Sequence, residues 1–194
     1  MTSIPALLTL ARALLGPVAV IAAHYHFPSV FFFCILVIGF LSDILDGVIA
    51  RQLGIATPDL RRADSLADTV FYIGICIAAF MLNPKEMTAY WPGIAVIVLL
   101  ELVRYGFDYW KFRQEAAYHM WSAKLWGVTL LAGFGEFFLT GKVGVLFEAA
   151  VAVGIFTEIE GLMASIVLRR WRHDVPTLYH AILLARQNRF SDLP

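Results

Sequence analysis

The stretch "SDILDGVIARQLGIATPDLRRADSLAD", residues 42–68, places four acidic side chains inside or beside segments that are otherwise almost entirely apolar. They are Asp43, Asp46, Asp64 and Asp68. The flanking residues 29–41 and 69–82 contain no charged side chain, and a short loop with Gly54 and Pro58 divides the stretch. The pattern predicts two neighbouring helices, with two carboxylates at the end of the first and two at the start of the second.

The composition indicates a membrane protein. Hydrophobic residues make up 60% of the 194 residues and charged residues 15%, and the mean hydropathy is +0.74. A helix needs about 20 mainly apolar residues to cross a bilayer. We therefore expect an all-α polytopic membrane protein whose six transmembrane helices fall in residues 4–24, 29–53, 63–82, 91–110, 122–140 and 143–167. Residues 1–168 would form one six-helix domain, with a basic tail at 169–194.

The placement of basic residues predicts the orientation. The loops after the second and fourth spans and the tail, together with the start of the fifth span, hold most of them: Arg51, Arg61, Arg62, Lys111, Arg113, Lys124, Arg169, Arg170, Arg172, Arg186 and Arg189. Only Lys85 and Lys142 lie on the other side, so those loops and both termini should face the cytoplasm. Arg12 and Arg104 fall within spans, so the orientation of the loops does not explain their positions. The tail stretch "VPTLYHAILLARQNRF" could form an interfacial helix with Leu178 toward lipid.

The four aspartates cannot face lipid. A carboxylate at the bilayer centre costs about 3 kcal/mol, so four would cost roughly 10 kcal/mol. Separations of three residues (Asp43, Asp46) and four residues (Asp64, Asp68) bring each pair onto one helix face. The short loop keeps the two helices neighbours, so all four carboxylates can converge in one cavity open to the cytoplasm.

Such a cluster needs cations, because its members repel one another. Hard divalent ions with oxygen ligands, Mg²⁺ or Mn²⁺, are the usual partners of clustered carboxylates. Two ions sharing these ligands would suit phosphoryl chemistry. A single acidic pair would be weaker evidence, since membrane helices also use lone acids as proton relays or salt-bridge partners.

The spacing of these residues resembles the signature of the CDP-alcohol phosphotransferase family, DxxDGxxAR followed by G, xxx, D, xxx, D. The matching residues are Asp43, Asp46, Gly47, Ala50, Arg51, Asp64 and Asp68. The resemblance extends to the architecture, because that family has six transmembrane helices and cytoplasmic termini. It implies two bound divalent ions, Mg²⁺ or Mn²⁺, and a homodimer.

The resemblance also implies roles for the matching residues. One ion would be bound by the first three aspartates, the other by Asp43, Asp64 and Asp68, and Asp68 would be the general base on the acceptor hydroxyl. In the nucleotide site, Gly47 and Ala50 would make room for the CDP moiety and Arg51 would lie close to it.

Two positions depart from the family pattern. Leu60 replaces its second glycine, which affects how closely the loop can approach the nucleotide, and Thr69 follows the last aspartate where phosphatidylglycerolphosphate synthases often have lysine.

Two other segments bear on the acceptor. Residues 3–17, "SIPALLTLARALLGP", resemble the first helix of phosphatidylglycerolphosphate and cardiolipin synthases, with Thr9 and Arg12 at the same spacing and Ala6 in place of Asn. Residues 122–127, "SAKLWG", resemble their GK segment, with Lys124 retained and Ala123 replacing Gly.

A cationic pocket for a phosphate on the acceptor is one explanation for the charge of Arg104. Lys124 and Arg113 would complete that pocket, as a substrate such as glycerol 3-phosphate requires. The alternative is an intrahelical pair of Arg104 with Asp108 or Glu101.

We therefore expect an integral protein of the bacterial inner membrane whose active site faces the cytoplasm. It would transfer a phosphatidyl group from CDP-diacylglycerol to an alcohol, with glycerol 3-phosphate as the lead acceptor, and release CMP in phospholipid biosynthesis. Inositol phosphate, phosphatidylglycerol, serine or choline are alternative acceptors. A UbiA-like membrane prenyltransferase and a non-enzymatic cation transporter are the other classes considered. Membrane lipids are expected partners, and nucleic acid is not.

Overall fold

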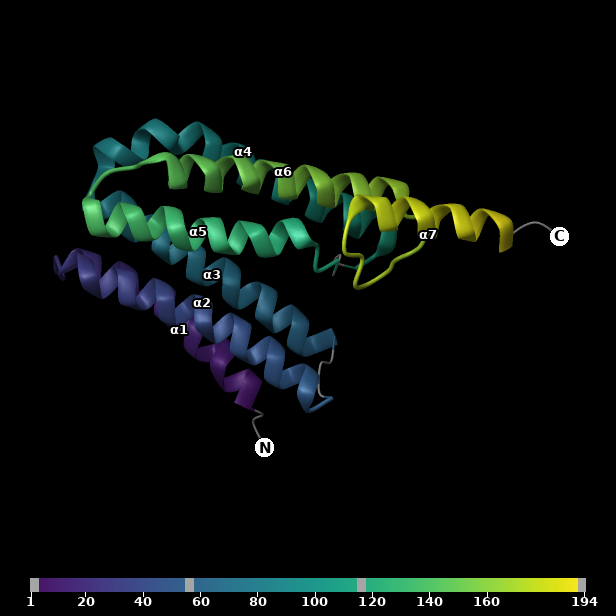
Figure 1. The fold of residues 1–194 in the computed structure, drawn as a ribbon, viewed down its shortest axis with the longest axis horizontal. Coiled ribbons are helices and arrows are strands. Elements are labelled where there is room, and N and C mark those ends of the chain that lie inside the picture. Colours follow the sequence, from purple (N-terminus) through teal and green to yellow (C-terminus); the bar gives the residue numbers. More distant parts are fainter. Residues whose placement is uncertain (1–3, 55–57, 115–117, 192–194) are drawn as a thin grey trace. The chain divides into compact units, whose positions relative to one another are not determined.

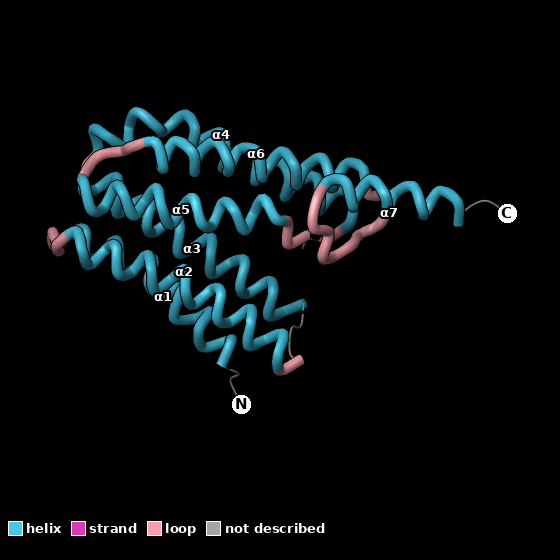
Figure 2. The backbone as a smooth tube through the Cα atoms, viewed as in Figure 1, coloured by secondary structure: helices cyan, strands magenta, loops and turns pink. Residues whose placement is uncertain are grey.

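The computed structural model describes residues 4–54, 58–114 and 118–191, and within these residues it contains helices and loops but no strand (Figure 2). Along the described chain the helices are α1 (Ile4–His24), α2 (Ser29–Gln52), α3 (Pro58–Leu82), α4 (Pro84–Phe112), α5 (Trp121–Thr140), α6 (Val145–Val167) and α7 (Leu178–Ser191). The all-α fold expected from the sequence is confirmed.

Five of these helices are long and apolar enough to cross a membrane: α1, α2, α3, α4 and α6. They correspond to five of the six expected spans, although α3 and α4 begin earlier than expected, at Pro58 and Pro84, and they make the chain an integral membrane protein. The helix expected over residues 122–140 is present as α5, but Lys124 and Glu136 lower its hydropathy, and it is not among the five. A sixth span and the cytoplasmic position of the termini stay predictions.

Local chemistry explains where several helices begin and end. Gly54 and Gly141 follow α2 and α5 with φ of 66° and 70°, the left-handed conformation that terminates helices and that glycine adopts without a Cβ clash. Asn83 precedes α4 with Pro84 at the first helical position, where a missing N–H costs nothing. The Thr177 hydroxyl accepts a hydrogen bond from the backbone N–H of His180 (3.4 Å) and so caps the start of α7.

The chain divides into two compact units. The first comprises Met1–Ala89 and Leu131–Gly144, so it contains α1, α2 and α3. Within it, α1 packs against both α2 and α3 (Figure 1). The helices α1 and α3 approach each other closely at two glycines, because a Cβ on Gly74 would lie 2.5 Å from the backbone of Gly16. Small residues at such crossings let helix backbones approach one another, and this crossing fixes the register of α1 on α3.

The second unit comprises Tyr90–Leu130 and Val145–Pro194. Its described part includes α6 and α7, which pack against each other. Residues of these two helices join the neighbouring loops in a cluster of buried side chains: Tyr118, Met120, Ala164, Leu168, Val175 and Ala181, with Phe112, Leu178 and Leu184 packed against it. The stretch expected to form an interfacial helix is thus helical, but Leu178 packs on the protein. Leu183, which is 37% exposed, lies on the open side of α7.

Candidate active site

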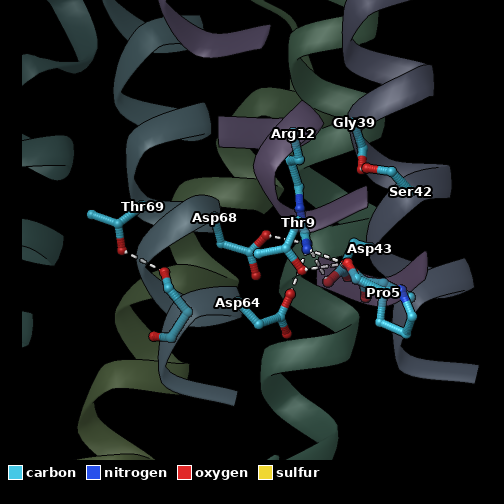
Figure 3. A network of polar contacts seen from close by, with 11 residues as sticks. Pro5, Thr9, Arg12, Gly39, Ser42, Asp43, Asp64, Asp68 and Thr69 are labelled. Carbon is cyan, nitrogen blue, oxygen red and sulfur yellow. Dashed lines mark hydrogen bonds and ion pairs between the residues drawn. The ribbon is translucent and has the colours of Figure 1, made fainter. Parts of the chain in front are cut away.

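The four motif aspartates converge in the first unit, as the sequence predicts. We call Asp43, Asp46, Asp64 and Asp68 the aspartate cluster. The first two lie one turn apart on α2 and the other two lie one turn apart on α3. Figure 3 shows the carboxylates of Asp43, Asp64 and Asp68 turned toward the end of the Arg12 side chain, which reaches them from α1. Three helices therefore contribute charged groups to one site.

The guanidinium of Arg12 contacts every carboxylate of the cluster. Its Nη1 donates to Asp43 Oδ1 and to Asp68 Oδ1, each at 2.5 Å. Its Nη2 donates to Asp46 Oδ2 at 2.5 Å and also to Asp64 Oδ1. Charge-assisted hydrogen bonds of this kind are about twice as strong as neutral ones. One guanidinium thus bridges four carboxylates, and the site has an excess of negative charge when the carboxylates are ionised.

The cluster has a buried side and an accessible side. Arg12 and Asp46 are 1% and 4% exposed, and the Thr9 hydroxyl lies 3.3 Å from Asp46 Oδ2 while it donates to the Pro5 carbonyl at 3.0 Å. The side chains of Asp43, Asp64 and Asp68 are 43%, 29% and 37% exposed. Charged species can therefore reach three of the four carboxylates from outside the protein.

The residues fit a divalent metal ion. Asp43, Asp64 and Asp68 each offer a carboxylate oxygen, and these oxygens lie within 4.8 Å of one another. All are hard oxygen ligands, which Mg²⁺ and Mn²⁺ prefer. A cationic group, the guanidinium, already lies between them. This trio is the set that the family resemblance assigns to the second ion, while Asp46 lies deeper.

The glycine crossing determines where Arg12 lies. Gly16, one helical turn after Arg12, is so close to α3 that a Cβ there would lie 2.6 Å from the Val70 carbonyl oxygen. With α1 held against α3 at this level, the Arg12 side chain is level with Asp68 and Asp64. Sequence analysis singled out Arg12 but gave it no partner.

The nucleotide-site candidates lie on α2 beside the cluster. Gly47 follows Asp46 and is half-buried, and Ala50, one turn after Asp46, is 7% exposed. Arg51 lies in α2, but its side chain lies outside the described residues. Leu60, at the position of the missing motif glycine, lies in the first turn of α3 and is half-buried. Thr69 donates to the Ser65 carbonyl at 3.0 Å.

The acceptor-phosphate candidates Arg104, Lys124 and Arg113 all belong to the second unit. Arg104 Nε donates to Glu158 Oε2 of α6 at 2.9 Å, a partner that the sequence analysis did not consider. Lys124 Nζ lies over the Trp121 ring, 4.2 Å from its centroid. Arg113 is exposed just after α4 with φ of 60°. Two of the three basic groups therefore engage protein partners.

Two polar residues of the network escaped sequence analysis, Thr9 as a partner of Asp46 and Glu158 as the partner of Arg104. A usable signal was present, because charged residues inside membrane spans almost always pair with one another. A comparison of the acidic and basic residues within the spans would have predicted that Arg12 pairs with the aspartates and that Arg104 pairs with an acidic residue.

Comparison with known proteins agrees with this geometry. A family model for CDP-alcohol phosphatidyltransferase matches residues 2–159, which include α1 to α5 and the whole aspartate cluster. The chain belongs to the CDP-alcohol phosphatidyltransferase family. Members are membrane enzymes of phospholipid biosynthesis that transfer a substituted phosphate group from a CDP-alcohol to an acceptor alcohol and use a divalent metal. No curated protein and no solved structure matches this chain. Membership favours the phosphotransferase over the prenyltransferase and transporter interpretations.

Proposed function

We propose that this enzyme transfers the phosphatidyl group of CDP-diacylglycerol to the hydroxyl of a small alcohol, with glycerol 3-phosphate as the lead acceptor, and releases CMP. The observation that carries the proposal is the convergence of four carboxylates on one guanidinium. This arrangement leaves a strongly anionic site in a membrane enzyme whose family requires a divalent metal.

The aspartate cluster would hold Mg²⁺ or Mn²⁺, in two positions by analogy with the family. When bound, such ions neutralise phosphate charge and stabilise the charge that develops on the departing CMP. Asp43, Asp64 and Asp68 offer the accessible oxygens for this purpose, whereas Asp46 supports the site from its buried side.

Asp68 is the proposed general base. Its side chain is 37% exposed, so an incoming hydroxyl can approach it. In the reaction the acceptor oxygen attacks the phosphorus next to diacylglycerol, and its proton passes to the Asp68 carboxylate. The bond from that phosphorus to the bridging oxygen breaks, and CMP leaves with the electron pair. A positioned base of this kind contributes about 10²- to 10⁴-fold in rate.

The nucleotide would bind beside Gly47 and Ala50 of α2. Neither residue carries a side chain larger than a methyl group, so a base or ribose can approach the helix backbone there. Arg51 stays a proposed neighbour of the CDP moiety, at the end of α2 that lies near the cluster.

The acceptor assignment rests on charge. An acceptor that carries a phosphate, such as glycerol 3-phosphate, needs basic groups, and Lys124 and Arg113 are exposed basic side chains in the second unit. Arg104 stays a candidate, although part of its hydrogen-bonding capacity goes to Glu158. Inositol phosphate would use the same groups, whereas choline or serine would not require them.

The cellular setting is proposed from the sequence and the family. The excess of arginine and lysine in one set of loops supports a cytoplasmic active site, and a bacterial inner membrane is proposed as its location. Homodimerisation is proposed from family resemblance, and a monomeric mass both in detergent and in nanodiscs would rule it out.

The test is CMP release from CDP-diacylglycerol in detergent micelles with Mg²⁺ or Mn²⁺. Separate reactions contain glycerol 3-phosphate, inositol phosphate, serine, choline or phosphatidylglycerol, and Asp68→Asn is the inactive control. We expect release with glycerol 3-phosphate that disappears in the control. CMP release with only a different acceptor would support the proposed reaction but would show that glycerol 3-phosphate is not the acceptor. Absence of release with every acceptor, together with absence of metal-dependent CDP binding, would contradict the proposed function.

A further inference from the structure

Arg12 differs from an ordinary structural arginine in its surroundings. It is among the largest fully buried side chains, with 1% of its side chain exposed, and it forms ion pairs with all four carboxylates of the aspartate cluster. The formal charge of the guanidinium and the cluster together is therefore about −3 when every carboxylate is ionised.

The carboxylates need a cation when no metal is bound. Without one, four acidic groups at this separation would repel one another, and α2 and α3 would lose the arrangement that brings their aspartates together. The guanidinium supplies that cation from within the chain. It bridges two carboxylates through Nη1 and two through Nη2, so it holds the ligands of α2 and α3 in place before any ion arrives.

The same contacts compete with metal binding. Asp43, Asp64 and Asp68 form the trio that could hold an ion, and each uses its Oδ1 atom to accept a hydrogen bond from Arg12. The guanidinium is also not fully satisfied, because its buried Nε has no hydrogen-bond partner among the described residues. The guanidinium therefore pairs with the aspartates while one of its own donors lacks a hydrogen bond. A metal ion could replace it at this position.

We infer that Arg12 is the built-in counter-ion of the metal-free site, and that divalent ions bind by displacing its guanidinium from the aspartate cluster. Arg12 therefore acts as a positioning residue with two opposed effects. It stabilises the metal-free protein, and it weakens the affinity for metal. The inference concerns metal loading alone and does not depend on which alcohol is the acceptor.

The experiment measures Mn²⁺ affinity and metal-free stability on the same full-length protein. Chelated protein in detergent is titrated with Mn²⁺, and the loss of the free-ion electron paramagnetic resonance signal gives the dissociation constant. Thermal melts are recorded with chelator and with saturating Mn²⁺. The variants are Arg12→Gln, which removes the charge, and Arg12→Lys, which keeps the charge but loses the planar fork that can bridge several carboxylates. The matched control is Arg62→Gln, which removes one positive charge at an exposed position on α3 two residues before Asp64.

We expect Arg12→Gln to bind Mn²⁺ at least about tenfold more tightly than the wild type, because the competing charge is gone. Its melting temperature in chelator should fall below that of the wild type, and saturating Mn²⁺ should reduce the difference. Arg12→Lys should give an intermediate affinity. Arg62→Gln should change the affinity by less than about twofold, because solvent and salt screen exposed charges.

Unchanged or weaker Mn²⁺ binding in Arg12→Gln would overturn the inference, since a residue that merely supports the fold or the ligands lowers metal affinity when it is removed. If Arg12→Gln does not fold, Arg12→Lys decides: tighter binding than the wild type supports displacement, and equal or weaker binding contradicts it. Absence of Mn²⁺ binding in every variant and in the wild type would also overturn it. Mn²⁺ binding that follows the expected order, with neither CMP release for any acceptor nor metal-dependent CDP binding, would preserve this inference and contradict the proposed function.

Discussion

Two arginines inside expected spans, the buried Arg12 in the first unit and the half-buried Arg104 in the second, show how differently a membrane protein can use the same side chain. Arg104 Nε donates to the carboxylate of Glu158 at 2.9 Å, and this ion pair joins one positive group to one negative group. Arg12 contacts four carboxylates. The first contact sets one positive group against one carboxylate, and the second sets one positive group against four.

The difference separates a structural pair from a site. A balanced pair inside a membrane protein removes the cost of each charge and joins two helices, here α4 and α6. An unbalanced cluster stays anionic even with its internal partner, so it attracts further cations. The ratio of acids to bases, rather than the presence of an intramembrane charge, marks the place where chemistry is expected.

The largest effect is expected from neutralising one acid of the cluster. Asp64→Asn or Asp68→Asn should reduce the rate of CMP release by about 10²- to 10⁴-fold, because a metal ligand or the general base is lost. Initial rates measured on purified protein at saturating CDP-diacylglycerol and acceptor test this expectation. Asp174→Asn is the matched control, because Asp174 is exposed, pairs with His173 and has φ of 55°, which asparagine also adopts. Wild-type rates in either cluster variant would remove the cluster from the active site.

A second prediction disturbs the cluster without touching its charges. Gly74→Val should lower the free energy of unfolding by about 3 kcal/mol, because a Cβ at Gly74 would lie 2.5 Å from the backbone of Gly16 and would force α1 away from α3. Arg12 would move with α1, so Mn²⁺ affinity should change too, whereas the contact between Arg104 and Glu158 should persist. Reversible denaturation in mixed micelles measures the loss. The control is Gly106→Ala, at a helical glycine where an added Cβ meets nothing within 4 Å. It should cause no loss of stability.

A third prediction breaks the balanced pair. Glu158→Ala should cost about 2 kcal/mol of stability, since the charge-assisted hydrogen bond of Arg104 disappears and its charge loses its partner. The same denaturation experiment measures it. Glu158→Gln keeps an oxygen acceptor, so it should lose less stability than Glu158→Ala. If Glu158→Ala matched the wild type in stability, the pair could not be structural, and Arg104 would return as a candidate for the acceptor phosphate.

The smallest effect concerns Tyr118, in the loop before α5. Burial raises the pKa of Tyr118 to about 12, opposed by the hydrogen bond of its hydroxyl with Ser165 Oγ at 2.9 Å. The unfolded chain releases this proton near pH 10 and the folded chain does not, so stability falls as pH rises from about 10 to about 12.

Tyr118→Phe should remove this part of the alkaline loss and should cost about 1 kcal/mol at neutral pH, because the hydrogen bond is lost. Paired melts of the variant and the wild type at pH 8 and pH 11 measure both effects. If the difference in melting temperature between variant and wild type were the same at pH 8 and pH 11, the Tyr118 hydroxyl would have its ordinary pKa.

The elements of this fold were predictable because membrane helices are long and have a strong compositional signal. The expected span at residues 4–24 coincides with α1, and the other five lie within a few residues of their helices apart from the early start of α4. The inward packing of Leu178 was not predictable, because the periodicity of a short helix shows that it has an apolar side but not whether lipid or protein covers it.

The convergence of the four aspartates was predictable from the sequence, but the position of Arg12 among them was not. Spacings of three and four residues, together with the short loop, sufficed to bring the aspartates together. The position of Arg12 depends on the crossing of α1 and α3 at Gly16 and Gly74, a long-range contact between two residues that carry no recognisable signal by themselves. The partner of Arg104 likewise comes from α6, 54 residues away along the chain.

The most direct test of the difference between the two arginine sites is the change in melting temperature on adding Mn²⁺ to the chelated wild type, Asp64→Asn and Glu158→Gln. Binding to the folded state alone stabilises a protein by about 2.7 kcal/mol at a hundredfold excess over the dissociation constant. We expect Mn²⁺ to raise the melting temperature of the wild type and of Glu158→Gln, and to leave Asp64→Asn nearly unchanged. An unresponsive wild type, or an equal response in Asp64→Asn, would contradict the assignment of the aspartate cluster as the metal-binding active site.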